Sequence, residues 1–159
     1  MTGPVTNSAP KVEVLLVEDN PGDVELTRIA LREAKLSTPL KVVTDGEEAI
    51  AYLRSEPPFE HARRPVLILL DLNLPRMDGH EVLKTLKADP DLKHIPVCIL
   101  TTSGDEMDIA TSYSLYANSY IQKPSIIDHM VNVVAQINEY WLHTVQLPPN
   151  QPSHRHTGN

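Results

Sequence analysis

The alternation of short apolar runs with longer segments of helical periodicity is the feature that most constrains the fold of this chain. Five runs rich in Leu and β-branched residues occur at 12–18, 41–44, 66–72, 96–101 and 119–122. The third and fourth are apolar almost throughout, which is typical of strands buried on both faces of a parallel sheet. Parallel strands need crossover connections, and these are right-handed. The pattern therefore predicts an α/β fold of five βα units, with a doubly wound, five-stranded parallel sheet.

Start signals for helices support this alternation. Asn20 is followed by Pro21 and Asp23, which supply a cap, a first-turn proline and an acidic residue in the first turn. Asp45 and Ser125 each have an acidic residue three positions later, as in a capping box. Helices are therefore expected after the first, second and fifth strands.

Chain length and the distribution of apolar residues predict one domain. With 159 residues, the chain is long enough for one hydrophobic core and too short for two domains of ordinary size. Residues 1–10 and 148–159 are rich in small polar residues, Pro and His, so we expect a mobile amino-terminal arm and a mobile carboxyl-terminal tail. The folded domain is expected at 11–147, including an extension of its last helix.

Charge and cysteine content argue against several classes of protein. The chain has 21 acidic and 14 basic residues, a formal charge of −7, so we expect no direct binding of nucleic acid. Cys98 is the only cysteine and lies in an apolar run, which fits a reducing compartment. We find neither a secretory signal nor an apolar stretch of the roughly 20 residues that span a bilayer. A cytoplasmic protein without membrane contact is therefore expected.

The residues at the strand ends carry the functional argument. Glu18 and Asp19 end the first predicted strand, Asp71 the third and Thr101 the fourth, and Lys123 follows the fifth. Each alone is weak evidence, because Asp is common in turns, Thr in strands and Lys in solvated loops. The fold, however, brings the carboxyl ends of parallel strands to one edge of the sheet, where such folds bind their ligands. We therefore expect these side chains to form one site.

The acidic residues of this group predict a magnesium site. Three carboxylates in a crowded site cannot all stay ionised without positive charge, which a divalent cation and Lys123 would supply. Mg²⁺ prefers octahedral oxygen ligands and keeps several waters. Asp19 and Asp71 meet this need, with Glu18 acting directly or through water. The backbone carbonyl of Asn73 can turn back toward the same cation.

The same residues suit phosphoryl transfer to Asp71. Its carboxylate oxygen would act as the nucleophile, and Mg²⁺ would bridge this carboxylate and the incoming phosphoryl group. Lys123 and the hydroxyl of Thr101 would hold the remaining phosphoryl oxygens. No general base is required, because a carboxylate is already deprotonated at neutral pH.

Four sequence strings resemble the receiver domains of bacterial two-component response regulators. They are LLVEDNPGD, LLDLNLPRMDGHEVL, LTTS and YIQKP, and the resemblance covers about residues 11–140. It implies a flavodoxin-like strand order of 2-1-3-4-5, a histidine kinase as phosphoryl donor and Asp71 as phosphoacceptor. It also implies that Thr101 is a switch hydroxyl and Tyr120 a switch aromatic residue.

The resemblance also bears on the kind of activity to expect. It implies a stand-alone phosphoacceptor switch that assists its own phosphorylation and dephosphorylation, and not an enzyme with a separate substrate. The signal could leave through protein contacts or by phosphorelay, or the protein could act as a phosphate sink. The loop at 55–65 and the segment at 139–149 are similar to single-domain regulators that partner phytochrome photoreceptor kinases. A bacteriophytochrome is therefore a candidate partner.

Two other classes of function are less consistent with the sequence. A phosphatase of the haloacid dehalogenase type also places Asp after an apolar strand, but its nucleophile lies on the first strand, and Asn73 replaces its second Asp. A flavin-binding electron carrier shares the sheet topology but needs a Ser/Thr/Gly loop after the first strand to hold a phosphate. Glu18 and Asp19 would repel that phosphate.

The last helix predicts a surface for self-association. Tyr140, Trp141 and Leu142 are consecutive, so one helix face cannot bury all three. Tyr113 and Tyr116 on the preceding helix would extend the apolar area. Exposed apolar patches usually mark partner sites, and two-fold pairing is the commonest solution. We therefore expect a homodimer through the fourth and fifth helices and the carboxyl-terminal segment, tightened or rearranged by phosphorylation.

Overall fold

The computed structural model describes residues 13–149, so the expected arm at 1–10 and the tail from residue 150 onward lie outside the described residues. No helix in the described range is long and apolar enough to cross a membrane. The strands are β1 (Val14–Val17), β2 (Leu40–Val43), β3 (Leu67–Leu70), β4 (Val97–Thr101) and β5 (Ser119–Gln122). The helices are α1 (Pro21–Glu33), α2 (Gly46–Leu53), α3 (Gly79–Ala88), α4 (Glu106–Ser114) and α5 (Ile127–Glu139), which continues into the π-helical turn η2 (Tyr140–Thr144).

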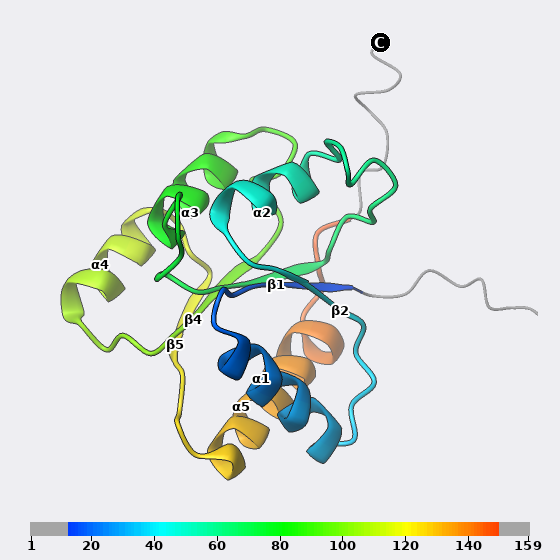
Figure 1. The fold of residues 1–159 in the computed structure, drawn as a ribbon, viewed down its shortest axis with the longest axis vertical. Helices are drawn as coiled ribbons and strands as arrows, with labels where there is room; N and C mark the ends of the chain where they lie inside the picture. Colours follow the sequence, from blue (N-terminus) through cyan, green and yellow to red (C-terminus); the bar gives the residue numbers. More distant parts are fainter. Residues whose placement is uncertain (1–12, 150–159) are drawn as a thin grey trace, which may run out of the picture.

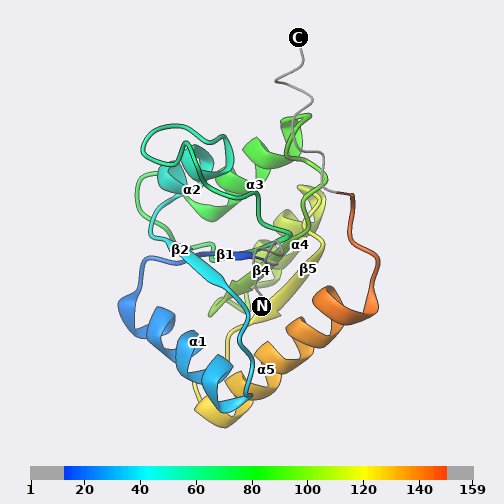
Figure 2. The same ribbon diagram turned by 90° about the vertical axis from the view of Figure 1, so that its right-hand side faces the viewer.

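The five strands form one parallel sheet in the order β2-β1-β3-β4-β5, which confirms the expected fold class and strand order. Helices α1 and α5 cover one face of this sheet, and α2, α3 and α4 cover the other (Figures 1 and 2). Val17 at the end of β1 is in register with Val43 of β2 and Leu70 of β3. The residues that follow these strands therefore emerge side by side.

The central strands carry the core. Every residue of β3 and β4 is buried, as their apolar runs predicted, and so is every residue of β1. Leu70 and Ile99 pack into a core beneath α2 and α3, whereas Leu69 and Cys98 pack with Met130 beneath α1 and α5. Each fully buried Leu or Ile contributes about 1.5–3 kcal/mol, so the strands that carry the site residues are firmly held.

Two of the three predicted helix caps are present in the structure, and the third prediction is wrong. The side chain of Asn20 accepts from the N–H of Asp23 at 3.1 Å, and that of Asp45 caps α2 in the same way. The cap of α5 is Ile126, without a side-chain hydrogen bond. Because this helix begins only at Ile127, Ser125 precedes the cap position and cannot close a capping box.

Candidate functional site

The strand ends bring the expected site residues to one edge of the sheet. Glu18 and Asp19 follow β1 directly, and Asp71 follows β3. Thr101 is the last residue of β4, and Lys123 comes directly after β5. The backbone N–H of Lys123 donates to the carbonyl of Thr101 at 2.6 Å. The four strand ends therefore surround one small volume beside Asp71.

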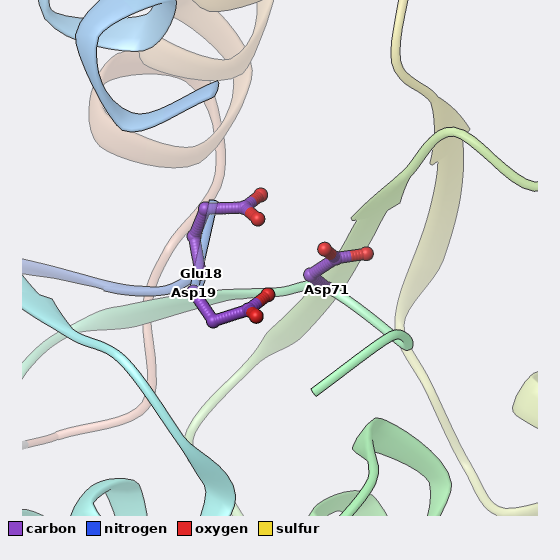
Figure 3. Close-up of side chains that lie close together, drawn as sticks. All are labelled: Glu18, Asp19 and Asp71. Carbon is purple, nitrogen blue, oxygen red and sulfur yellow. The ribbon is translucent and has the colours of Figure 1, made fainter. Parts of the chain in front are cut away.

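Three carboxylates form an acidic group at this edge. One oxygen from each of Glu18, Asp19 and Asp71 lies within 4.8 Å of the others. Figure 3 shows the carboxyl groups of Glu18 and Asp19 turned toward that of Asp71. Glu18 and Asp71 are buried and Asp19 is exposed, so the group opens to solvent on one side. Several oxygen donors with one side open to water fit a hard divalent cation such as Mg²⁺.

Lys123 lies among the carboxylates. Its Nζ donates to Glu18 Oε1 at 2.5 Å and to Asp23 Oδ2 at 2.9 Å, and it lies 3.8 Å from Asp71 Oδ2. Only 2% of the Lys123 side chain is exposed. A charge this well buried requires hydrogen-bonded partners of opposite charge. Glu18 and Asp23 supply them, whereas Asp71 is beyond hydrogen-bonding distance of the ammonium.

Burial and ion pairing act in opposite directions on the pKa values of the site. Desolvation raises the pKa of Glu18 above its ordinary value, opposed by the hydrogen bond from Lys123 and reinforced by the charge of Asp71. Burial alone would lower the pKa of Lys123, but its bonds to Glu18 and Asp23 and the charge of Asp71 raise it above the ordinary value. Lys123 is therefore an ammonium at neutral pH.

Thr101 places an unpaired hydroxyl in the site. The residue is fully buried, and its Oγ1 has no hydrogen-bond partner within residues 13–149. A buried polar group left without a partner costs roughly 1–3 kcal/mol. Such groups are rare, and each calls for an explanation such as an absent ligand. An anionic oxygen bound beside Asp71 would supply the acceptor that Thr101 lacks.

The loop after Asp71 is held close to it. The N–H of Asn73 donates to Asp71 Oδ1 at 3.4 Å, and the N–H of Gly79 donates to the carbonyl of Leu72 at 3.0 Å. A Cβ on Gly79 would lie 2.4 Å from the carbonyl oxygen of Asp71, so only glycine allows α3 to begin this close to the site. The role of the Asn73 carbonyl as a cation ligand stays a prediction.

Family comparison agrees with this geometry. The response regulator receiver domain family matches residues 14–135, a range that contains the whole sheet and every strand-end residue described above. The chain belongs to this family. The matched range includes the carboxyl edge of the sheet, where the structure brings Glu18, Asp19, Asp71, Thr101 and Lys123 together.

Similar receivers are known from phytochrome signalling. Response regulator Rcp1 of Synechocystis sp. is 44% identical over 142 residues, which cover 89% of this chain and 96% of Rcp1. The phosphorylated cyanobacterial phytochrome response regulator RcpA has a TM-score of 0.82 at 46% identity and covers 88% of this chain and 100% of its own. The Mn²⁺-bound form of Rcp1 has a TM-score of 0.80 at 44% identity, with the same shares covered. The resemblance to phytochrome-associated regulators is thereby confirmed.

Sequence reasoning missed one residue of this site. Asp23 was expected only as an acidic residue in the first turn of α1, yet its side chain bonds to Lys123, 100 positions away. The sequence offers one signal for it, a third acidic residue within six positions of the end of β1.

The expected interface residues flank the edge strand β5. Tyr113 and Tyr116, in α4 and just after it, are exposed, and so is Tyr140 at the start of η2. Trp141 and Leu142 are half-buried and pack against the core beneath α1 and α5. Because α4 and α5 lie on opposite faces of the sheet (Figure 2), the exposed rings are carried by elements on both sides of it.

Proposed function

We propose that this receiver accepts a phosphoryl group from a histidine kinase onto a carboxylate oxygen of Asp71. The observation that carries the proposal is the convergence of a carboxylate, an ammonium and an unpaired hydroxyl at one edge of the sheet. In the transfer, a P–O bond to Asp71 forms as the P–N bond of the phosphohistidine breaks, and the imidazole leaves. Asp71 reacts as a carboxylate, so no proton has to be removed from it.

Asp19 and Asp71 would hold a divalent cation such as Mg²⁺, with Glu18 acting directly or through water and the Asn73 carbonyl completing the set. The bound cation supplies positive charge against the phosphoryl oxygens. The grouping of the carboxylate oxygens within 4.8 Å supports this assignment, as does the Mn²⁺-bound structure of the similar Rcp1.

Thr101 and Lys123 would stabilise the phosphoryl group once it is on Asp71. The Thr101 hydroxyl, which has no hydrogen-bond partner within the described residues, would donate to a phosphoryl oxygen, and Lys123 would supply positive charge beside Asp71. Both groups act on the transferring phosphoryl itself, so the receiver assists its own phosphorylation and dephosphorylation.

The same hydroxyl would start a conformational switch. Tyr120 lies on β5, and its hydroxyl donates to the carbonyl of Ser103 at 2.9 Å, in the loop that follows Thr101. A phosphoryl group that draws Thr101 inward moves the start of this loop, and Tyr120 follows through its hydrogen bond to Ser103. Phosphorylation would thereby reach α4 and the outer side of β5, from which the signal leaves through protein contacts or by phosphorelay.

The partner kinase is proposed to carry a phytochrome photosensor and to meet this receiver in the cytoplasm. RcpA is a cyanobacterial phytochrome response regulator and is 46% identical to this chain. To test this, a phytochrome-type histidine kinase autophosphorylated with radiolabelled ATP is mixed with the receiver and Mg²⁺. The label should move to the wild type and to Asp128→Asn, which changes an exposed aspartate on α5. Label on Asp71→Asn would overturn the proposed acceptor.

The cation site has its own test. Calorimetry should show Mg²⁺ binding to the unphosphorylated wild type, because the acidic group is otherwise self-repelling. Asp19→Asn should weaken this binding by about tenfold or more, the loss of one charged ligand. Glu60→Gln removes an exposed charge outside the acidic group and should leave the affinity for Mg²⁺ unchanged. Equal affinity of Asp19→Asn and wild type would remove Asp19 from the proposed ligands.

A homodimer is the assembly that the outer side of β5 supports. Tyr116 is 75% exposed and has a positive φ of 71° at the end of α4, where glycine is the favoured residue. Beside α5, a groove of about 420 Å³ is lined by residues of β5 and by Tyr140 and Trp141. The exposed ring of Tyr116 in its strained backbone position and the groove beside α5 each fit a contact surface.

Light scattering across micromolar concentrations tests this assembly. The wild type should approach twice the chain mass of 17.7 kDa, and a phosphoryl analogue should change the concentration at which it does so. The double variant Tyr116→Ser, Tyr140→Ser should remain near the mass of one chain. A constant mass of one chain for the wild type in both states would end the dimer hypothesis.

A further inference from the structure

Asp23 contacts the site from outside the acidic group. It lies in the first turn of α1, where its N–H donates to Asn20 and its carbonyl accepts from the hydroxyl of Thr27 at 2.9 Å. The cap of the helix is thus provided by Asn20, and the Asp23 carboxylate is left to bond with Lys123 at 2.9 Å. This contact joins α1 to the end of β5.

The two carboxylates bonded to Lys123 differ in exposure. Only 3% of the Glu18 side chain is exposed, compared with 29% for Asp23. A buried carboxylate that loses its partner keeps the full desolvation penalty, whereas a partly exposed one regains hydrogen bonds from water. Lys123 can therefore release Asp23 more easily than it can release Glu18.

A phosphoryl group on Asp71 would compete for the same ammonium. It carries about −1.5 to −2 charges and strong acceptor oxygens. Those oxygens extend beyond Asp71 Oδ2, which is 3.8 Å from Lys123 Nζ. The Asp23 carboxylate reduces the positive potential that Lys123 presents to them. Asp23 thus stabilises the unphosphorylated site more than the phosphorylated one.

We propose that Asp23 is a positioning residue that holds Lys123 in the unphosphorylated receiver and that phosphorylation of Asp71 displaces it into solvent. The inference rests on the proposed function of Asp71. Two consequences follow from the geometry. Asp23 limits how readily the site accepts phosphoryl, and phosphorylation loosens a link between α1 and β5.

Asp23→Asn tests this because it keeps the side-chain shape and a carbonyl acceptor while removing the charge. The probe is beryllofluoride, formed from beryllium chloride and sodium fluoride, which binds aspartate as a phosphoryl analogue and is followed by ¹⁹F NMR at saturating Mg²⁺. Asp23→Asn should bind it about tenfold more tightly than wild type, or about 1.4 kcal/mol. Asp23→Ser should show the same direction.

The matched control is Glu25→Gln, which removes the same charge from α1. Glu25 is exposed, and its Oε2 lies 3.6 Å from Arg32 Nη2, so solvent and salt screen its charge. The affinity of Glu25→Gln for beryllofluoride should therefore stay within about twofold of wild type. The ammonium resonance of Lys123, observed by ¹⁵N NMR without Mg²⁺, should shift in Asp23→Asn and not in Glu25→Gln.

Two failures of this experiment are distinguishable. Equal or weaker beryllofluoride binding by folded Asp23→Asn would overturn the role of Asp23 while leaving the phosphoacceptor intact. If the wild type bound no beryllofluoride, or if Asp71→Asn bound it equally well, the proposed function itself would fail.

Discussion

The carboxyl edge of the sheet and the outer side of β5 are organised in opposite ways. At the edge, polar groups are buried. Lys123 and Glu18 are shielded from water, and the Thr101 hydroxyl has no partner in the part of the chain that the structure describes. Beyond β5, apolar rings are exposed, with Tyr140 at 53% and Tyr116 at 75%. Both arrangements run against the usual rule that charges lie outside and large apolar groups inside.

The difference shows what each region lacks. The edge lacks positive charge to balance its carboxylates and an acceptor for the Thr101 hydroxyl among the described residues, and small ions can supply both. The exposed rings beside β5 lack a second apolar surface that covers them, which a protein can supply. β5 joins the two, since Tyr120 lies on it and Lys123 follows it directly. A phosphoryl group on Asp71 would therefore be able to alter the surface on the outer side of β5 through this strand.

The largest expected effect comes from removing the buried ammonium group of Lys123. Lys123→Met leaves Glu18 buried without its partner, and breaking such a pair should lower the free energy of unfolding by about 3 kcal/mol in urea without divalent cations. Mg²⁺ should recover part of this loss because it restores positive charge. Lys84→Met, at an exposed position of α3, should stay within about 0.5 kcal/mol of wild type. Equal stabilities of the two variants would contradict the buried-charge description.

A smaller difference in the free energy of unfolding is expected between loss of an unpaired hydroxyl and loss of a paired one. Thr101→Val replaces the hydroxyl with a methyl group of similar size, so it leaves no cavity and should leave the free energy of unfolding unchanged or slightly raised. Ser112→Ala removes a buried hydroxyl that donates to the Asp108 carbonyl at 2.8 Å and should lower it by about 1 kcal/mol. Urea unfolding of both variants measures the difference. A loss in Thr101→Val as large as that in Ser112→Ala would show that the Thr101 hydroxyl has a partner in solution.

The smallest effect concerns the outer side of β5. Tyr116→Gly relieves a positive φ at the end of α4 and should raise the free energy of unfolding of the monomer by about 0.5 kcal/mol. The same change should weaken the proposed dimer. Tyr113→Ser removes a neighbouring exposed ring from ordinary helical backbone, so it should give no such gain. If Tyr116→Gly were destabilising, the ring would be packing within its own chain.

The fold was predictable because its determinants are local. Uninterrupted apolar runs mark β3 and β4, and Asn20 and Asp45 mark helix starts, so the βα order can be read without long-range information. The cap predicted at Ser125 was wrong because α5 begins only at Ile127, with Ile126 at the cap position. The spacing of Ser125 and Asp128 locates a helix start only to within a residue or two.

The site was predictable only as far as the strand ends locate it. Glu18, Asp19 and Asp71 adjoin strands, and the topology alone brings their side chains together. Asp23 was missed because its contact with Lys123 joins the first turn of α1 to the residue after β5, 100 positions away. The burial of Lys123 likewise depends on residues far away in the sequence. Neither leaves a pattern in the sequence.

Asp71 alone is proposed to accept a phosphoryl group in this receiver. Acetyl phosphate and Mg²⁺ should add one phosphoryl group per chain, seen by intact-mass spectrometry as a single acid-stable, base-labile adduct that peptide mapping assigns to Asp71. Asp71→Asn should remain unmodified under the same conditions, and Asp128→Asn should behave as wild type. Full labelling of Asp71→Asn, or an adduct mapped to another residue in the wild type, would contradict the account.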